Sequence, residues 1–275
     1  MLSRNRWLSA LLLSFVAVLL VVGCGGGDDE GEDSGEGAAA ADQTLKWGLG
    51  AEYNLDPGLA TDTTSAKLVL NIFDPLVKLD DELNAVPSMA DSWDVNGAKV
   101  VYHLKTGAKW SNGDPVTAKD YEYAWKRALS PELASDYSYQ LYGIKGGVEY
   151  NECEKNCAAL RDKVAVKATD DKTLEVTLTS TQPWFIQQSA HSVFLPVHQK
   201  TVEQFGERWT RPENIVTNGP FKVEAAQPSA SITLVKDTNW RDAANVKLER
   251  VEGRIIVDGT TAVQSFEAGE VDVLD

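Results

Sequence analysis

The sequence predicts an α/β protein that is exported from the cytoplasm. Three observations lead to this prediction: 43% of the 275 residues are apolar, strand-like and helix-like patterns alternate along the chain, and an export signal precedes them. That apolar content is sufficient to bury a core, which excludes wholesale disorder. Because domains average roughly 100–200 residues, the length corresponds to one large domain or two modest ones.

The N-terminal residues have the composition of an export signal. Arg4 and Arg6 precede an apolar run over 8–22, and Gly23 and Cys24 follow. A basic start, an apolar stretch of about fifteen residues and a small residue before the cleavage site are typical of a signal peptide. Residues 21–24, VVGC, resemble a bacterial lipobox, in which the cysteine becomes the lipidated first residue. The sequence therefore predicts a lipoprotein signal peptide over 1–23 and lipidation of Cys24, with an ordinary secretory signal as the alternative.

Residues 24–41 are predicted to be an acidic, glycine-rich tether, because they are Gly, Asp, Glu and Ser followed by four Ala, without apolar periodicity. The signal peptide holds two of the 26 basic residues and the tether six of the 41 acidic ones. The remainder therefore has 24 basic and 35 acidic residues, a net charge near −11. This excess of carboxylates argues against nucleic-acid binding, which needs clustered Lys and Arg.

The first elements after the tether are a strand, a turn and a helix. A short strand is predicted over 45–49 and a turn over 53–58. A helix over 65–73 follows, because Leu68, Ile72 and Phe73 recur on one helical face. The next strand is predicted over 99–105, with successive side chains on opposite faces.

The clearest helix pattern lies in KWSNGDPVTAKDYEYAWKRAL, over 109–129. Thr117 fits a helix N-cap, with Asp120 three positions later, in an acidic relative of the capping box. The helix that follows ends before Pro131. Its apolar stripe contains Tyr121, Ala124, Trp125, Ala128 and Leu129. We expect Trp110 and Trp125 to lie in the core, because the capped helix buries its stripe.

The remaining elements are mainly strands. A hairpin is predicted from 163–168 and 173–179, and later strands over 221–225, 231–236, 246–252 and 254–257. Thr260 is predicted to cap a helix that runs to Ala268, with Gly269 at its C′ position. A last strand begins at 271–274 with no closing element, so we expect a truncated chain.

Two cysteines besides Cys24 lie close together, at Cys153 and Cys157. An exported chain reaches a compartment that permits oxidation, so we expect a local disulfide, with two free thiols as the alternative. A structural zinc site needs four ligands, and no His or further Cys lies within several residues of the pair. No metal site is predicted.

No catalytic constellation is present in the sequence. It contains no G-x-S-x-G elbow, H-E-x-x-H motif, Walker loop or complete G-x-G-x-x-G fingerprint. The histidines, at His103, His191 and His198, have no recognised ligand spacing. The paired carboxylates at 80–81 and 170–171 lie in predicted turns, where Asp bonds its own backbone. We therefore predict that the protein is not an enzyme and has no cofactor.

Four segments resemble a known family. They are LDPGLATDTTSAKLVLNIFDPLVKLD (55–80), VPSMADSWDV (86–95), the 109–129 passage and ENIVTNGPF (213–221). In this order they resemble the N-terminal half of the bacterial extracellular solute-binding proteins of family 5, the oligopeptide-binding lipoproteins of peptide/nickel ABC transporters. The stretches KVAVKATDDKTLEVTL (163–178) and NIVTNGP (214–220) favour oligopeptide binders over nickel binders.

The resemblance implies a periplasmic-binding-protein-like type II fold (class C, peptide-binding subclass) with two lobes. Residues 42–63 and 198–275 would form the first, discontinuous α/β lobe, and 64–197 the extra α+β domain of the family. The second lobe would follow residue 275 and is missing from this chain. The implied protein is a monomer, lipid-anchored to the outer face of the cytoplasmic membrane or facing the periplasm, that captures oligopeptides and delivers them to an ABC permease and its ATPases.

The resemblance also implies which residues contact ligand. The loop over 51–54 would border the cleft and extend a bound peptide as an added strand, through Glu52, Tyr53 and Asn54. Glu52 would face a side-chain pocket, and His191 matches a pocket histidine. Either Tyr137 or Tyr139 matches an aromatic wall residue, and the sequence does not choose between them.

Competing functions stay open at this point. The same family includes binders of other solutes, such as oligosaccharides, dipeptides and nickel. A secreted carbohydrate-active enzyme would also be acidic and rich in Trp, of which this chain has eight. A sensor or scaffold lipoprotein without a permease is a further alternative.

Overall fold

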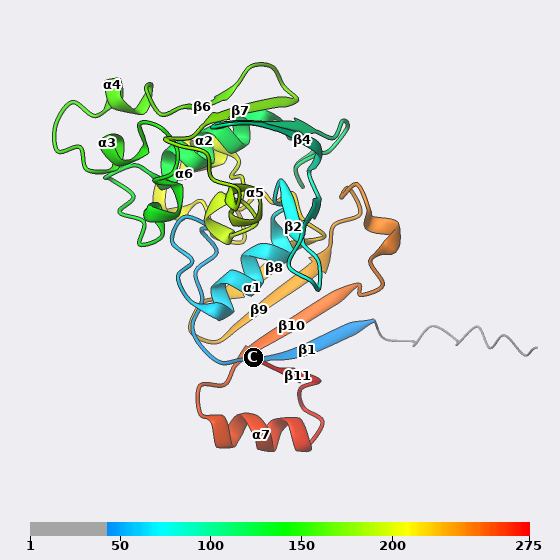
Figure 1. The fold of residues 1–275 in the computed structure, drawn as a ribbon. Coiled ribbons are helices and arrows are strands. Elements are labelled where there is room, and N and C mark those ends of the chain that lie inside the picture. The colour runs from blue at the N-terminus through cyan, green and yellow to red at the C-terminus, as the bar shows by residue number, and fades with distance from the viewer. Residues whose placement is uncertain (1–42) are drawn as a thin grey trace, which may run out of the picture. The chain divides into compact units, whose positions relative to one another are not determined.

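The protein is described by a computed structural model over residues 43–275, in which helices surround three β-sheets (Figure 1). The predicted signal peptide, the lipidation of Cys24 and the tether lie outside the described residues. Among residues 43–275, no helix has the length and apolar character needed to cross a membrane.

The largest sheet has five strands in the order β11-β1-β10-β9-β8. β1 is parallel to both β10 and β11, whereas β9 is antiparallel to β10 and β8. The sheet therefore joins a strand from the beginning of the described chain to strands near its end. Its strands are β1 (Thr44–Leu49), β8 (Phe221–Gln227), β9 (Ser231–Lys236), β10 (Arg250–Ile255) and β11 (Val273–Leu274).

One prediction in this sheet was wrong. The strands expected over 246–252 and 254–257 are one strand, β10, which continues through Gly253. A Cβ at this glycine would lie 2.8 Å from Ile232 Cγ2 and 2.9 Å from Leu49 Cδ1. Glycine is thus inside the strand because the neighbouring side chains leave no room for a larger residue.

The second sheet has four antiparallel strands in the order β4-β5-β7-β6. They are β4 (Ala90–Asn96), β5 (Lys99–Leu104), β6 (Val166–Ala168) and β7 (Thr173–Thr177). β5 shows the predicted alternation, with Val100, Tyr102 and Leu104 buried. The predicted hairpin is confirmed as β6 and β7, with shorter strands. β4 was not predicted, because most of its residues are exposed at the sheet edge and give no apolar alternation.

The third sheet is a hairpin of β2 (Val77–Leu79) and β3 (Ala85–Pro87). Its turn begins at Asp80, whose Oδ1 accepts the N–H groups of Glu82 and Asn84 at 3.1 and 2.7 Å. The carboxylate of Asp170 likewise accepts the N–H of Lys172 in the β6–β7 turn. Both acidic pairs therefore lie in turns, as the sequence predicted.

The helices and 3₁₀ turns connect and cover these sheets. α1 packs against β8, α2 packs against β6 and β7, and α7 contacts β11 (Figure 1). The α-helices are α1 (Thr63–Ile72), α2 (Ala118–Ala128), α3 (Gly147–Asn151), α4 (Ala158–Arg161), α5 (Phe185–Gln188), α6 (Gln199–Phe205) and α7 (Gly259–Glu267). The 3₁₀ turns are η1 (Ser138–Leu141), η2 (Ser192–Phe194), η3 (Gly206–Arg208) and η4 (Ala243–Asn245).

The helix caps were predicted with mixed success. Thr117 is the N-cap of α2, and the Asp120 carboxylate accepts its N–H at 2.7 Å, as expected. The predicted cap of α7 was wrong by two residues. Asp258 is the N-cap, and its Oδ1 accepts the N–H of Thr261 at 2.8 Å, while Thr260 lies inside the helix. Aspartate ranks above threonine as a cap, which explains why the helix begins earlier.

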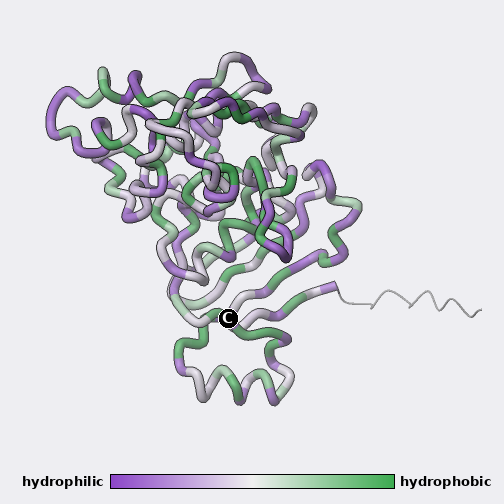
Figure 2. The backbone as a smooth tube through the Cα atoms, viewed as in Figure 1, coloured by the Kyte–Doolittle hydropathy of each residue, from purple (hydrophilic) through white to green (hydrophobic). Residues whose placement is uncertain are grey.

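The core is built around large aromatic side chains. Trp110 and Trp125 are fully buried, as predicted, and so is Trp209. Trp125 packs edge-on against Phe194 with ring centroids 5.0 Å apart, and its Nε1–H donates to the Phe194 carbonyl at 2.8 Å. Figure 2 shows green stretches both in the interior and in the segments that flank α7, and purple stretches in the protruding loops at the upper left.

Candidate functional site

Three of the predicted ligand residues lie together. The rings of Tyr137 and His191 are in edge-to-face contact, with centroids 4.8 Å apart, and Tyr139 is 6.0 Å from Tyr137. We call these three residues the aromatic cluster. Tyr137, not Tyr139, contacts the histidine, and the Tyr139 side chain is exposed. Because η1 and η2 are far apart in sequence, only the fold brings these rings together.

The histidine of the aromatic cluster is held in a defined orientation. His191 is the N-cap of η2, and its Nδ1 accepts the N–H of Val193 at 3.2 Å. Burial lowers the pKa of His191 below its ordinary value, so the ring is neutral at pH 7. A neutral ring that accepts at Nδ1 carries its proton on Nε2, so Nε2–H is the donor that the ring can offer to a ligand.

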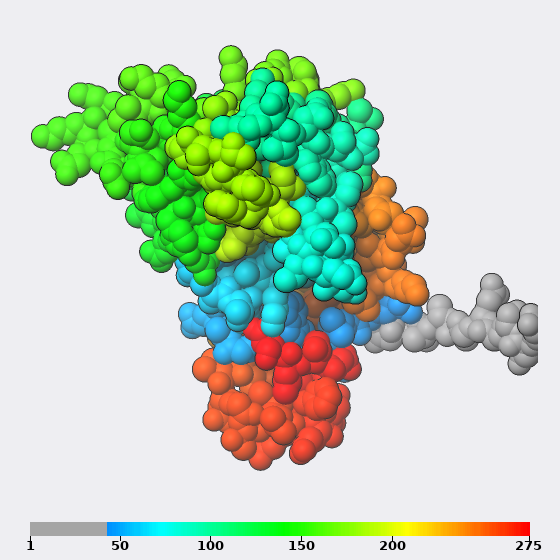
Figure 3. All heavy atoms as spheres, in the orientation of Figure 1, coloured from blue at the N-terminus to red at the C-terminus, as the bar shows by residue number. Residues whose placement is uncertain are grey.

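A cavity of about 530 Å³ lies beside the aromatic cluster, between β2, α1, η1 and the segment around α5. We call it the glutamine cavity, because the amides of Gln140, Gln187 and Gln188 share its wall with His191. Its other lining residues are Leu70, Pro75, Val77, Lys78, Leu79 and Ala190. Figure 3 shows the two segments that supply most of this wall, the β2–β3 hairpin and the region of α5, side by side on one face.

One hydrogen-bonded pair fixes part of this wall. The Gln188 amide donates to both the carbonyl and the Oε1 of Gln140, each at 2.9 Å. This pair ties α5 to η1, the turn that carries Tyr139. The cavity thus combines apolar surface with neutral hydrogen-bonding groups, an arrangement typical of a binding site for a small ligand.

Two of the other predicted ligand residues, Tyr53 and Asn54, line a second cavity. This loop cavity has a volume of about 550 Å³ and is lined by Tyr53, Asn54, Leu55, Thr210, Arg211, Pro212, Glu213, Ala226 and Pro228. Glu52 is exposed beside it on the same loop. The 210–213 wall was not predicted to contact ligand, because residues 210–212 follow no recognisable pattern.

The side chains of Tyr53 and Asn54 are already engaged within the protein. Tyr53 is buried, its hydroxyl donates to the Ser231 carbonyl at 2.7 Å, and burial raises its pKa to about 12. Asn54 accepts the N–H of Asp56 through Oδ1 at 2.9 Å, and its own N–H donates to Ser65 Oγ. These contacts give both residues a part in shaping the loop.

The backbone of the same loop retains unused donors. Among residues 43–275, no group accepts a hydrogen bond from the N–H of Ala51, Glu52 or Tyr53. The N–H of Asn54, the last residue of the loop, is bonded to Ser65 Oγ at 2.8 Å. Three consecutive residues of this loop therefore leave their N–H groups without an acceptor among residues 43–275.

A buried ion pair holds this loop against the rest of the protein. Arg127 of α2 donates to both oxygens of the Asp56 carboxylate, at 2.9 and 2.6 Å. Trp209 donates to the same carboxylate through Nε1 at 3.1 Å. Trp209 immediately precedes the 210–213 wall, so these contacts fix both walls of the loop cavity. Tyr137 is linked to the same loop through its hydroxyl, which donates to the Thr61 carbonyl at 3.2 Å.

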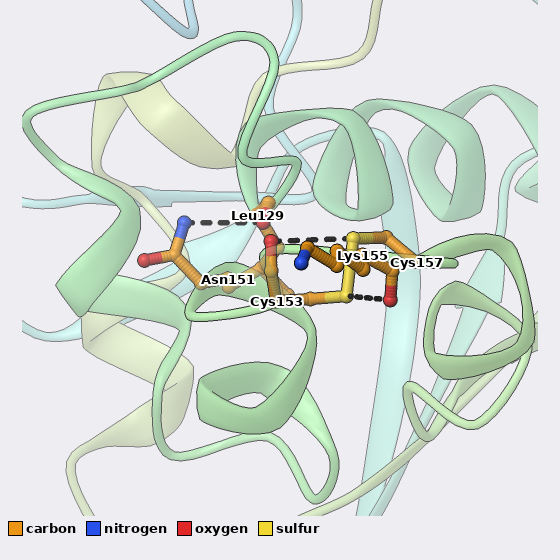
Figure 4. The surroundings of a disulfide bond; sticks show 5 residues. All are labelled: Leu129, Asn151, Cys153, Lys155 and Cys157. Carbon is orange, nitrogen blue, oxygen red and sulfur yellow. Dashed lines mark hydrogen bonds between the residues drawn. A yellow bond between two sulfur atoms is a disulfide. The ribbon is translucent and has the colours of Figure 1, made fainter.

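The two remaining cysteines lie in the loop between α3 and α4. The sulfurs of Cys153 and Cys157 are joined in a disulfide bond (Figure 4). Asn151, just before this loop, donates through Nδ2 to the Leu129 carbonyl at the end of α2 (Figure 4). The disulfide therefore closes a short loop whose base is fastened to α2.

Comparison with known proteins gives one family match and many similar chains. The model of the bacterial extracellular solute-binding proteins, family 5 middle region, matches residues 84–275. The chain is 37% identical to the oligopeptide-binding protein OppA of Bacillus subtilis, over 98% of this chain and 49% of that protein. It is 35% identical to the probable deoxycholate-binding periplasmic protein YgiS of Escherichia coli, over 80% of this chain and 41% of that protein.

Solved structures agree with the sequence matches. OppA of Burkholderia pseudomallei superposes with a TM-score of 0.79 at 30% identity, over 86% of this chain and 46% of that chain. The chain thus spans about half the length of the curated relatives it matches.

Proposed function

Because the chain belongs to the bacterial extracellular solute-binding proteins of family 5, we propose that it is the N-terminal half of the oligopeptide-binding lipoprotein of an ABC importer. In this proposal the complete protein captures peptides outside the cytoplasmic membrane and delivers them to a permease and its ATPases. Lipidation of Cys24 anchors it to the outer face of that membrane, and it acts as a monomer.

The observation that carries this proposal is the run of unused N–H groups at Ala51, Glu52 and Tyr53. Every peptide presents carbonyl oxygens at regular spacing, whatever its side chains. A strand edge that offers N–H groups therefore binds peptides by a feature that they all share. Sugars and metal ions have no such repeat, so this edge favours peptides over both.

The loop cavity, which Tyr53 and Asn54 line, and the glutamine cavity, which His191 lines, both suit side chains of varied size. Each has a volume of about 530–550 Å³, and each combines apolar surface with a few polar groups. Water in such cavities adapts its hydrogen bonds to different side chains at little cost. In our proposal Glu52 faces a ligand side chain, while Tyr137, Tyr139 and His191 provide an aromatic wall.

The proposal also divides the described residues between two domains. Residues 42–63 and 198–275 form the first lobe, and 64–197 form the extra domain. The composition of the sheets supports this division, since the five-stranded sheet contains no strand from 64–197 and the other two sheets contain no strand from outside it. The second lobe lies in sequence beyond residue 275.

The test is a thermal-shift screen of the complete protein with peptides, nickel, oligosaccharides and deoxycholate. A ligand that binds the folded state raises the melting temperature. We expect a rise with peptides of several sequences and none with the other solutes. A rise with oligosaccharides or deoxycholate alone would assign another solute to the same site, and hydrolysis of a ligand would favour an enzyme.

A further inference from the structure

A third cavity carries a charge opposite to that of the protein as a whole. It has a volume of about 350 Å³ and lies between the loop after β5 and the β6–β7 turn. We call it the lysine pocket, because Lys105, Lys109 and Lys172 line it. Its other lining residues are Thr106, Gly107, Ala108, Gly113, Pro115, Val116, Thr117 and Asp171.

The three lysines form no ion pair in the described part of the chain, although the carboxylate of Asp170 lies close enough to Lys172 to interact with its charge. Of residues 43–275, none places a carboxylate within ion-pair distance of Lys105, Lys109 or Lys172. The lining carboxylate, on Asp171, is already paired with Lys119 at 2.7 Å. Asp170 lies nearby, and its Oδ1 accepts the Lys172 N–H. The pocket therefore retains positive charge in a chain whose net charge is −15.

The backbone adds further donors to the same wall. No acceptor among residues 43–275 is bonded to the N–H groups of the four residues from Thr106 to Lys109. Gly107 adopts a left-handed conformation with φ of +80°, and a Cβ there would meet nothing within 4 Å. Successive unbonded N–H groups in a turn with a left-handed residue are typical of concave anion-binding sites.

The walls of the pocket are fastened to one another. The Leu104 N–H donates to the Lys172 carbonyl at 2.7 Å, and the Ala118 N–H donates to the Asp171 carbonyl at 2.9 Å. The Val116 N–H donates to the Ala108 carbonyl at 3.0 Å. The backbone that carries the lysines is therefore held in place by hydrogen bonds within the protein, without a ligand.

We propose that the lysine pocket binds a phosphate group. A phosphate group carries one negative charge in a diester and close to two in a monoester at neutral pH, and it has several acceptor oxygens, so it matches three ammonium groups and a run of N–H donors. A carboxylate offers one charge and two oxygens and matches this set less well. The site lies on other residues than the glutamine and loop cavities, so it does not depend on the function proposed for them.

The test is titration calorimetry of the full chain with inorganic phosphate at low salt. Each of the substitutions Lys105→Gln, Lys109→Gln and Lys172→Gln is expected to weaken binding at least about fivefold, the effect of removing one unit charge at ~4 Å in water from a ligand with a single negative charge. The triple variant is expected to lose about a hundredfold. Lys247→Gln is the matched control, because Lys247 is exposed, lines none of the three cavities and has no ion pair among the described residues. It is expected to change nothing.

A substitution that is expected to strengthen phosphate binding separates the proposal from a loss of folding, because a misfolded variant would bind more weakly. Asp171→Asn removes the lining carboxylate and frees Lys119, while the carbonyl that accepts the Ala118 N–H remains. It is expected to tighten phosphate binding several-fold. The proposal is overturned if the parent chain does not bind phosphate, if the triple variant binds as well as the parent, or if acetate binds as tightly as phosphate.

A second arm identifies where the phosphate comes from. The parent and the triple variant are sedimented with phosphatidylglycerol and with phosphatidylcholine vesicles, and their comparison cancels any contribution of the N-terminal segment. A loss of binding to phosphatidylglycerol in the triple variant supports a lipid headgroup. Equal sedimentation of both chains, together with lysine-dependent binding of inorganic phosphate, supports a soluble phosphate compound.

Discussion

Arg127 and Asp56 form a bidentate ion pair across 71 positions of sequence, with N–O distances of 2.9 and 2.6 Å. Only 16% of the arginine side chain and 5% of the aspartate side chain are exposed. Trp209 completes the set through a hydrogen bond to the same carboxylate and through its ring, whose centroid is 5.8 Å from the guanidinium carbon. The pair links α2 to the loop that follows β1, and so connects the conformation of a predicted ligand loop to the core.

We predict that Arg127→Gln lowers the free energy of unfolding by about 3–5 kcal/mol, because it leaves a buried carboxylate without its partner. Urea unfolding monitored by tryptophan fluorescence measures the change. Arg161→Gln is the control, since Arg161 is exposed and has no ion pair among residues 43–275, and it is expected to stay within about 0.5 kcal/mol of the parent. The double variant Asp56→Asn/Arg127→Gln should lose less than the sum of the single losses; additive losses would contradict a direct pairing.

The disulfide is predicted to make a small contribution to stability. Cys153 and Cys157 are four positions apart, so the bond closes a loop of about five residues, for which the loss of chain entropy in the unfolded state is worth about 2 kcal/mol. The variant Cys153→Ser/Cys157→Ser should therefore have a free energy of unfolding that is lower by about 2 kcal/mol, which urea unfolding measures. Titration of thiols under denaturing conditions, without reductant, should detect neither cysteine; two reactive thiols would show that the pair is reduced.

The sequence was most informative where a periodic pattern met a capping residue. The helix over 118–128 was predicted with both ends, because Thr117 and Asp120 mark its beginning and its apolar stripe fills one face. The strand over 250–255 was predicted as two, because a central glycine normally weakens a strand. Its place inside β10 depends on Leu49 and Ile232, which are distant in sequence, so no local pattern reports it.

The candidate site was predictable residue by residue but not as an arrangement. The resemblance to a family pointed to Tyr137, Tyr139 and His191, and the structure brings their rings together. It did not indicate Gln140 or the 210–213 wall, because these residues enter the cavities only through packing of distant segments. Single residues follow from motifs, whereas the shape of a cavity follows from the tertiary fold.

His191 is predicted to make stability depend on pH in the mildly acidic range. Burial lowers its pKa in the folded protein below the ordinary value of 6.5. Well above pH 6.5 the ring is neutral in both states, so His191 does not change the free energy of unfolding there. As the pH falls below 6.5, the unfolded state takes up a proton first, so the free energy of unfolding decreases until the folded ring is protonated as well.

Urea unfolding at a series of pH values between about 4 and 8 tests this dependence. His191→Asn should flatten the profile below pH 6.5, because the amide does not titrate and its oxygen can still accept the Val193 N–H. His103→Gln is the variant for comparison, since His103 is half-exposed on β5 and its Nε2 lies 2.9 Å from the exposed carboxylate of Asp94. A profile that is equally steep after His191→Asn would assign the dependence to other groups.

Residues 42–275 alone are predicted to bind peptides weakly. In the proposed function, ligand affinity comes from closure of two lobes, and closure is favoured only by contacts that both lobes make with the ligand. In that proposal residues 42–275 supply only the contacts of the first lobe and the extra domain: the N–H groups at 51–53, the aromatic cluster and the residues that line the two cavities. A peptide that binds only these residues still loses its translational freedom and its chain entropy. It makes only about half of the contacts that the closed protein would offer, so the net affinity is low.

We therefore expect residues 42–275 to bind oligopeptides more weakly than 100 μM or not at all, an affinity below about 5.5 kcal/mol. Calorimetry with peptides of three to five residues measures it, and the complete protein, which should bind at least about a hundredfold more tightly, is the control. Tyr137→Ala in the complete protein should weaken the same peptides, because it removes the ring that packs on His191. Micromolar binding by residues 42–275 alone would mean that one wall is sufficient, and that affinity in this protein does not require closure.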